Sequence, residues 1–180
     1  MTNKLPIRCA ILTISDRCAR GEQEDQSGPA LAQVLAAWGW EPELCEVLPD
    51  DEYAIAERLA SLADQSFDLV VTTGGTGLGP RDRTPEATLR VADRLVPGLA
   101  ELVRTRTGAR FPRAYLSRGV AATRDNCLFL NLPGSPRGAR EGLEALADVL
   151  PHALEVIREV PGGKDPHEAG IGPGEESIRS

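Results

Sequence analysis

Short apolar runs alternate along the chain with stretches in which apolar residues recur at helical spacing. Four runs of five to eight residues predict buried strands: Ile7–Ile14, Pro42–Leu48, Phe67–Val71 and Cys127–Leu132. Between the first three runs, helical spacing joins Leu31, Val34, Leu35 and Trp38, and then Ile55, Leu59 and Leu62. Because strands that alternate with helices form mainly parallel sheets, the pattern predicts an α/β fold with helices on both faces of a central sheet.

The second half of the chain continues the alternation with shorter elements. We expect a helix from Thr84 to about Leu95, a second from Pro97, a helical turn over 112–117 and a short strand over 120–122. Two further helices are predicted around Leu143, Leu146, Val149, Leu154 and Ile157. Beyond residue 160 glycine, proline and charged residues dominate, so we expect one folded domain over 5–160 and a flexible tail over 161–180.

Length and composition limit the function classes. A chain of 180 residues buries one core, and its net charge of −7 disfavours nucleic acid and anionic lipid as partners. No apolar run has the roughly 20 residues of a membrane span, and no signal peptide precedes the first strand, so we expect a cytoplasmic protein. The cysteines and histidines lack metal-site spacing and favour packing or surface roles: Cys9, Cys18, Cys45, Cys127, His152 and His167.

The stretch from Thr72 to Thr88 is the strongest candidate for chemistry. It places four glycines within six residues between a buried strand and a helix start, with Thr84 expected at the N-cap and Pro85 at the first helical position. Such an arrangement directs backbone N–H groups at an anion. Pro80-Arg81 stands where a P-loop requires Lys-Ser/Thr, and the glycine spacing also differs from the dinucleotide fingerprint. Phosphate binding and a plain tight turn both remain open.

A second strand, turn and Ser-Pro helix start follows at Pro133-Gly134-Ser135-Pro136. Ligands of parallel sheets bind beyond the carboxyl ends of strands. The loops at Asp50, at Gly74 and at Gly134 all follow predicted strands, so we expect them to face one crevice.

Charged side chains gather in the same loops. Carboxylates beside a phosphate site favour Mg²⁺, although a helix cap or a solvated turn explains any one of them equally well: Asp16, Asp50, Asp51 and Asp82. Three arginines at or near the crevice would offset phosphate charge, with surface ion pairs as the alternative: Arg81, Arg118 and Arg137.

These motifs together resemble the molybdenum cofactor biosynthesis family, which includes MogA- and MoaB-type proteins and the plant Cnx and gephyrin G domains. The resemblance covers roughly residues 7–160 and rests on motifs in the family's order: Ser15-Asp16-Arg17, Pro49-Asp50, Thr73-Gly74-Gly75-Thr76-Gly77, Pro80-Arg81-Asp82, Thr84-Pro85-Glu86-Ala87-Thr88, Leu116-Ser117-Arg118 and Asn131-Leu132-Pro133-Gly134-Ser135-Pro136. Arg83 and the turn Arg124-Asp125-Asn126 depart from the family's pattern.

The resemblance implies a three-layer α/β/α fold, a homotrimer and molybdopterin adenylyltransferase activity with ATP and Mg²⁺. It implies that Asp50 and Asp82 are the catalytic and metal-binding residues. It also implies substrate or nucleotide contacts, with phosphates at the glycines and the pterin near Ser117, Arg118 and Asn131: Ser15, Gly74, Gly75, Thr76, Gly77, Thr84, Ser117, Arg118, Asn131, Pro133, Gly134 and Ser135. A molybdenum-insertion protein is an expected partner. The alternatives are a non-catalytic pterin-binding protein of the MoaB type and an unrelated nucleotide-binding regulator.

Overall fold

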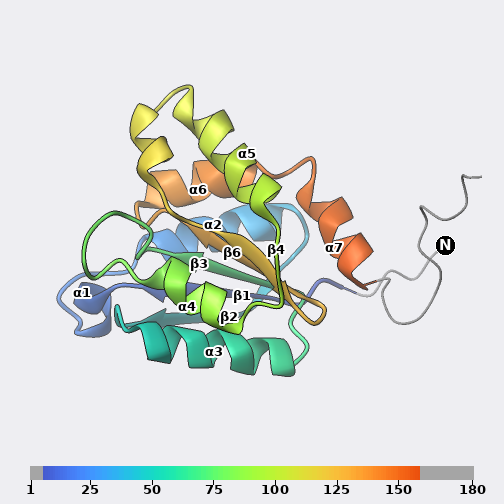
Figure 1. The fold of residues 1–180 in the computed structure, drawn as a ribbon, viewed down its shortest axis with the longest axis horizontal. Coiled ribbons are helices and arrows are strands. Elements are labelled where there is room, and N and C mark those ends of the chain that lie inside the picture. Colours follow the sequence, from blue (N-terminus) through green and yellow to red (C-terminus); the bar gives the residue numbers. More distant parts are fainter. Residues whose placement is uncertain (1–5, 159–180) are drawn as a thin grey trace, which may run out of the picture.

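A central sheet with helices on both faces organises the computed structural model, which describes residues 6–158 (Figure 1). Its strands are β1 (Cys9–Ile14), β2 (Pro42–Leu48), β3 (Leu69–Thr73), β4 (Arg94–Leu95), β5 (Ala121–Arg124) and β6 (Cys127–Leu132). Across the sheet they follow the order β2-β1-β3-β6-β5-β4. The first four in this order are parallel, whereas β5 is antiparallel to β6 and β4 is antiparallel to β5. The predicted mainly parallel sheet is confirmed.

The helices form a layer on each face of the sheet. They are α1 (Asp16–Ala19), α2 (Ser27–Ala37), α3 (Glu52–Asp64), α4 (Thr84–Val91), α5 (Pro97–Gly108), the 3-10 helix η1 (Pro112–Leu116), α6 (Pro136–Glu144) and α7 (Leu150–Arg158). One core joins the sheet to α2, α5, α6 and α7, and the other joins it to α3 and α4. Successive residues of β1 alternate between them: Cys9 and Ile11 in the first, Ala10 and Leu12 in the second. The three-layer fold is confirmed.

The predicted helix from Thr84 to Leu95 is too long. The helix ends at Val91, and Arg94–Leu95 form the edge strand β4 instead. Asp93 and Val96 donate backbone hydrogen bonds to carbonyls of β5, both at 2.8 Å. Sheet pairing therefore replaces the last predicted helical turn, because it gives these backbone groups partners that a helix end leaves unsatisfied.

The cap predicted at Thr84 is also wrong. Arg83 occupies the N-cap position, where its side chain makes no capping hydrogen bond, and Thr84 is the first helical residue. The buried Thr84 hydroxyl donates instead to the Gly74 carbonyl at 2.9 Å, so it holds the preceding loop. At the equivalent position before α6, Ser135 is the N-cap as predicted and accepts the Gly138 N–H at 3.1 Å.

The thiols divide into buried and accessible pairs. Cys9 and Cys127 lie in the core, where burial raises the pKa of each thiol to about 12. Cys45 is exposed on β2 and Cys18 is half-buried on α1. A packing role is therefore confirmed for the first pair alone.

Part of the predicted domain organisation lies outside the residues that the structure describes. The ends of the predicted domain at residues 5 and 160, and the predicted tail over 161–180, fall outside the described residues. Within 6–158, no helix is long and apolar enough to cross a bilayer.

Candidate phosphate-binding site

Two glycine-bearing loops meet at the carboxyl edge of the parallel strands. The loop after β3 turns at Gly74 and Gly75, whose φ angles of 102° and 63° are unfavourable for residues with side chains. A Cβ at Gly75 would also lie 2.2 Å from the Thr84 hydroxyl oxygen. The loop after β6 comes so close that a Cβ at Gly134 would lie 3.0 Å from the Gly74 Cα. The expected meeting of these two loops is confirmed.

Hydrogen bonds hold the two loops together. The Thr73 hydroxyl donates to the Pro133 carbonyl at 2.7 Å, and the Gly74 N–H donates to the Leu132 carbonyl at 3.1 Å. Both bonds extend the pairing of β3 with β6 beyond the strand ends. The sheet therefore fixes where each loop begins.

A pocket of about 520 Å³ opens beside this contact. It is lined by the glycine loop, by the end of α5 with η1, and by the β6–α6 loop with the start of α6. The predicted site residues on its wall are Gly74, Gly75, Thr76, Gly77, Asp82, Ser117, Pro133, Gly134 and Ser135. The five others predicted lie off this wall: Ser15, Asp50, Thr84, Arg118 and Asn131.

The pocket wall carries unused backbone donors. Within residues 6–158, the N–H groups of Gly75, Thr76 and Gly77 have no acceptor, and neither do those of Gly134 and Ser135. The last two precede α6, so the positive end of that helix dipole lies beside them. Two groups of free N–H donors on touching loops suit a ligand with two phosphates.

Asp82 lies on the pocket wall and is enclosed by its own loop. Its Oδ2 accepts the Gly79 N–H at 2.8 Å, while its N–H donates to the Gly79 carbonyl at 3.0 Å. A Cβ at Gly77 would lie 2.9 Å from the same Oδ2, so the loop passes closer to the carboxylate than a side chain would permit. These glycines let the chain wrap Asp82 while the carboxylate still faces the pocket.

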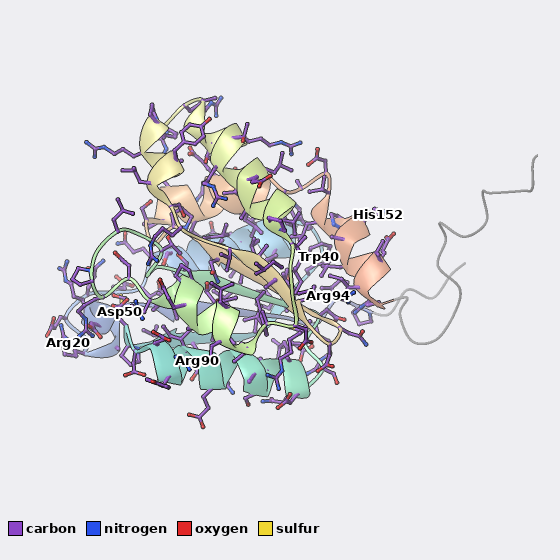
Figure 2. The ribbon with its side chains drawn as sticks, in the orientation of Figure 1. Arg20, Trp40, Asp50, Arg90, Arg94 and His152 are labelled. Atoms are coloured by element: carbon purple, nitrogen blue, oxygen red, sulfur yellow. The ribbon has the colours of Figure 1, made fainter. Side chains whose placement is uncertain are left out.

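Asp50 lies next to the glycine loop, at the end of β2 (Figure 2). Its Oδ2 accepts the Asp16 N–H at 2.8 Å, and Asp16 Oδ1 accepts the Asp50 N–H at 3.0 Å. Arg81 forms an ion pair with Asp16 at 2.5 Å. The Asp50 Oδ1 is 3.5 Å from the position that a Cβ of Gly75 would take, so Asp50 adjoins the loop behind the pocket wall.

Asp50 and Asp82 each keep a carboxylate oxygen that could bind Mg²⁺. Within the described part of the chain, Oδ1 of Asp50 and of Asp82 accepts no hydrogen bond. No group of three His, Cys, Asp or Glu residues is placed there to hold a metal ion. Mg²⁺ is commonly bound by one or two carboxylates together with substrate phosphates and waters. The two aspartates fit a site of that kind, and not a cage made only of protein ligands.

Two residues expected at the ligand are hydrogen-bonded within the protein. Asn131 is buried on β6, where its amide donates to the Thr72 and Thr88 hydroxyls, both at 3.0 Å. Arg118 donates from Nε to the Gly77 carbonyl at 2.7 Å, and its other nitrogens donate to the Asp82 carbonyl and to Glu86. Hydrogen bonding to Arg118 lowers the pKa of the Glu86 carboxyl below its ordinary value.

One wall of the pocket was not predicted from the sequence. Phe111 and Arg113 line it from the α5–η1 segment, opposite α6. The Arg137 guanidinium, expected near the crevice, lies over the Phe111 ring at 4.0 Å and pairs with Glu141 at 2.9 Å. This wall forms where two segments distant in the sequence meet. A local motif does not signal it, although an aromatic residue before a Pro-initiated turn and an arginine within that turn are a weak hint.

This fold and site define an α/β protein with two donor-bearing loops at the carboxyl edge of a parallel sheet, an arrangement suited to a phosphorylated ligand. The model of a family described as a probable molybdopterin binding domain matches residues 10–152, and the chain belongs to this family. It is 40% identical over 154 residues to a molybdopterin adenylyltransferase of Helicobacter pylori, covering 84% of this chain and 88% of that protein. It is 42% identical over 145 residues to the molybdopterin adenylyltransferase of Escherichia coli, covering 79% and 74%.

A solved structure gives the same fold. The crystal structure of the molybdopterin biosynthesis enzyme MoaB from Thermus thermophilus superposes with a TM-score of 0.82 and 51% sequence identity. The match covers 86% of this chain and 98% of that one. The family resemblance seen in the motifs is therefore confirmed.

Proposed function

We propose that this protein is a molybdopterin adenylyltransferase of molybdenum cofactor biosynthesis, which transfers AMP from ATP to the molybdopterin phosphate. The observation that carries the proposal is the pair of touching loops with free N–H donors around Asp82. An adenylyl transfer joins two phosphate-bearing substrates and therefore needs two anion sites side by side. The curated relatives that share most of the chain carry the name of this activity.

The reaction forms one bond and breaks one. An oxygen of the molybdopterin phosphate attacks the α-phosphorus of ATP, the bond to the bridging oxygen breaks, and pyrophosphate leaves with its electron pair. The glycine loop and the Gly134–Ser135 turn would each bind one phosphate group through their free N–H donors. Arg113 of η1 and Arg137 of α6, which both line the pocket, would offset the charge that two polyanions bring together.

Asp82, together with Asp50, would hold Mg²⁺ beside the phosphates. When bound, the ion would neutralise charge on the ATP phosphates and on the leaving pyrophosphate. The reciprocal bonds between Asp50 and Asp16 fix one carboxylate, and the wrapped loop fixes the other. Both carboxylates would therefore be oriented before substrate arrives, which reduces the reorganisation needed in the transition state.

A turnover assay tests the proposal. Purified full-length protein is incubated with molybdopterin, ATP and Mg²⁺, and adenylylated molybdopterin and pyrophosphate are quantified. We expect both products in equal amounts, with neither formed when ATP or molybdopterin is omitted. If the protein binds molybdopterin but forms no product, it is a binding protein and the enzyme assignment fails. ATP binding without a preference for the pterin would indicate a nucleotide-binding regulator.

The assembly and location follow as further parts of the proposal. We expect a homotrimer in the cytoplasm that passes its product to a molybdenum-insertion protein. Exposed apolar side chains beside the pocket, Leu78, Tyr115 and Leu116, offer surface for contacts between subunits. Light scattering coupled to size-exclusion chromatography should give three times the 19.3 kDa chain mass, and a monomer would contradict this part.

A further inference from the structure

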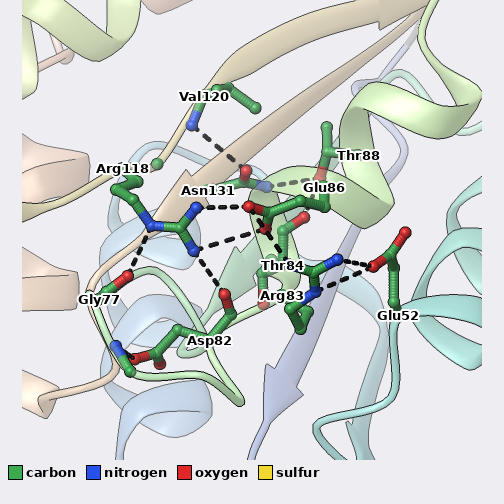
Figure 3. Close-up of polar contacts among 12 residues, drawn as sticks. Glu52, Gly77, Asp82, Arg83, Thr84, Glu86, Thr88, Arg118, Val120 and Asn131 are labelled. Carbon is green, nitrogen blue, oxygen red and sulfur yellow. Dashed lines mark hydrogen bonds and ion pairs between the residues drawn. The ribbon is translucent and has the colours of Figure 1, made fainter.

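Arg118 bonds the glycine loop at two separate points (Figure 3). Arg118 lies between η1 and β5, more than 30 residues along the chain from this loop. Its Nε donates to the Gly77 carbonyl at 2.7 Å, and one terminal nitrogen donates to the Asp82 carbonyl. Its backbone N–H donates to the Thr76 carbonyl at 2.9 Å. Arg118 therefore binds both ends of the segment from Gly77 to Asp82, which encloses the Asp82 carboxylate.

Between these two points one other side chain anchors the loop to its surroundings, since Arg81 pairs with Asp16 at 2.5 Å and donates to the Asp50 carbonyl at 3.3 Å. Leu78, Gly79 and Pro80 are exposed, and the Leu78 side chain is 68% accessible to solvent. A glycine-rich segment without core contacts loses much conformational freedom when it is ordered. Its shape must come from hydrogen bonds, and Arg118 supplies two from its guanidinium.

Glu86 fixes the orientation of Arg118 from the first turn of α4. Its Oε1 accepts from one terminal nitrogen and its Oε2 lies 3.4 Å from the other. A guanidinium is planar with a fixed fork of donors, so an acceptor on one edge sets where the remaining donors point. All three nitrogens of Arg118 are then bonded to protein oxygens, and Arg118 does not line the pocket.

We propose that Arg118 and Glu86 are a positioning pair that holds the glycine loop, and with it the Asp82 carboxylate, for the transfer reaction, and that Arg118 is not a pterin ligand. The proposal rests on the proposed adenylyl transfer. It differs from the role implied by the family resemblance, which placed Arg118 on the pterin side.

Arg118→Gln and Glu86→Gln test the pair in the full-length protein. Misplacing a catalytic group by about 1 Å lowers turnover by about 100-fold. We expect Arg118→Gln to lower kcat by about that factor while KM for molybdopterin changes by less than about 3-fold. Glu86→Gln should lower kcat in the same direction by about 10-fold, because an amide still accepts one hydrogen bond but lacks the charge. The double variant should be no slower than Arg118→Gln, because both changes remove the same pair that positions the loop.

A neighbouring arginine provides the matched control. Arg90 lies on the same helix as Glu86, but it pairs with Glu52 of α3 at 2.6 Å and makes no bond to a loop carbonyl in the described structure. Arg90→Gln should leave kcat within about 2-fold of wild type. If Arg118→Gln does not fold, Arg118→Lys retains the charge without the planar fork and should show the same loss of kcat.

Hydrogen exchange separates failure of this pair from failure of the enzyme assignment. In the Arg118 variant, the hydrogen-bonded amides of Gly79 and Asp82 should exchange at least about 10-fold faster, with the sheet amides unchanged. A rise of 10-fold or more in KM for molybdopterin with unchanged kcat and unchanged exchange would make Arg118 a ligand contact and overturn the proposal. If wild type lacks turnover, the enzyme assignment fails. Faster exchange in the Arg118 variant would then still support the proposal that Arg118 holds the glycine loop. Unchanged exchange would overturn that proposal.

Discussion

The two edges of the parallel sheet both carry aspartates and arginines, but they use them differently. At the amino edge, Asp68 before β3 is bonded on both oxygens to Arg158 and also accepts the Arg8 N–H at 2.7 Å. At the carboxyl edge, Arg118 donates to backbone carbonyls of the glycine loop, and Asp82, on the pocket wall, keeps one carboxylate oxygen without a hydrogen bond in the described structure. The first edge satisfies its carboxylate internally, and the second leaves a carboxylate oxygen available.

Cavity size does not distinguish these edges. The pocket at the amino edge, lined by Arg8, Asp68 and Arg158 among others, has about 640 Å³, compared with about 520 Å³ at the carboxyl edge. Arg8 is also occupied, because it pairs with Glu43 at 2.8 Å and lies over the Phe67 ring. Free N–H donors and an available carboxylate therefore mark the functional site better than volume does.

The largest difference should appear when one carboxylate at each edge is neutralised. Asp82→Asn retains an acceptor for the Gly79 N–H, so the loop should keep its shape. Loss of the charge beside the transferring phosphate should lower kcat by about 1,000-fold, equivalent to about 4 kcal/mol. The free energy of unfolding should change by less than about 0.5 kcal/mol, measured by urea denaturation.

Asp51→Asn is the matched control for the loss of a nearby charge. Asp51 is exposed and caps α3 by accepting the Ala54 N–H at 2.8 Å, and asparagine caps helices about as well. We expect its kcat within about 2-fold of wild type. Equal losses in the two variants would mean that general charge, and not the place of Asp82, supports turnover.

At the amino edge the same kind of change should affect stability and not turnover. Asp68→Ala leaves Arg158 largely buried without its main partner, and we expect unfolding to become easier by about 3 kcal/mol. Asp64→Ala nearby removes an exposed pair with Arg124 and should cost about 0.5 kcal/mol. Urea denaturation of both variants measures the difference. A turnover defect in folded Asp68→Ala protein would contradict the division between the edges.

Asn131→Ala sharpens the comparison within the carboxyl edge itself. Its buried amide serves the Thr72 and Thr88 hydroxyls, and its oxygen accepts the Val120 N–H at 3.3 Å. Removal should lower the free energy of unfolding by about 2 kcal/mol, because buried polar groups lose their partners. Isothermal titration with molybdopterin should give an affinity within about 3-fold of wild type. A 10-fold weaker affinity with normal stability would indicate that Asn131 contacts the ligand.

The sequence predicted β1, β3 and β6 well because each is buried on both faces and is therefore a continuous apolar run. It did not predict β4, a two-residue edge strand whose pairing with β5 leaves no pattern in Arg94 and Leu95. It identified the glycine loop because the turn at Gly74 and Gly75 has both a positive φ and no room for a Cβ.

Residue type did not predict the direction in which the side chains at the site point. A threonine before Pro85 fits a helix cap, yet the Thr84 hydroxyl bonds the carbonyl of Gly74, ten residues earlier. An arginine beside a phosphate site fits a ligand contact, and the hydrogen bonds that the structure gives the Arg118 guanidinium go to loop carbonyls and to Glu86. Both outcomes depend on where a distant backbone segment passes, and the Phe111 wall of the pocket depends on it in the same way.

The smallest effect should be the response of the Glu86 pair to acid. Hydrogen bonding to Arg118 holds the pKa of Glu86 below its ordinary 4.5, and Arg83 lies 3.9 Å away on the same helix start. A carboxyl whose pKa is lowered by folding stabilises the protein above its unfolded pKa, and this contribution is lost as the pH falls through the folded pKa. Wild type should therefore exceed Glu86→Gln in stability by at most about 1 kcal/mol at pH 7, since both side chains remain partly in solvent.

That difference should shrink once the pH falls below about 4.5 and the carboxyl begins to protonate. Urea denaturation of wild type and Glu86→Gln between pH 3 and pH 7 measures it. Glu22→Gln is the control, because Glu22 also has a pKa lowered by an arginine, Arg20, but lies in solvent and should show a smaller dependence on pH. A gap between wild type and Glu86→Gln that stayed constant down to pH 3 would mean that Glu86 supports Arg118 through shape alone, and the carboxyl edge would then depend on geometry and not on charge.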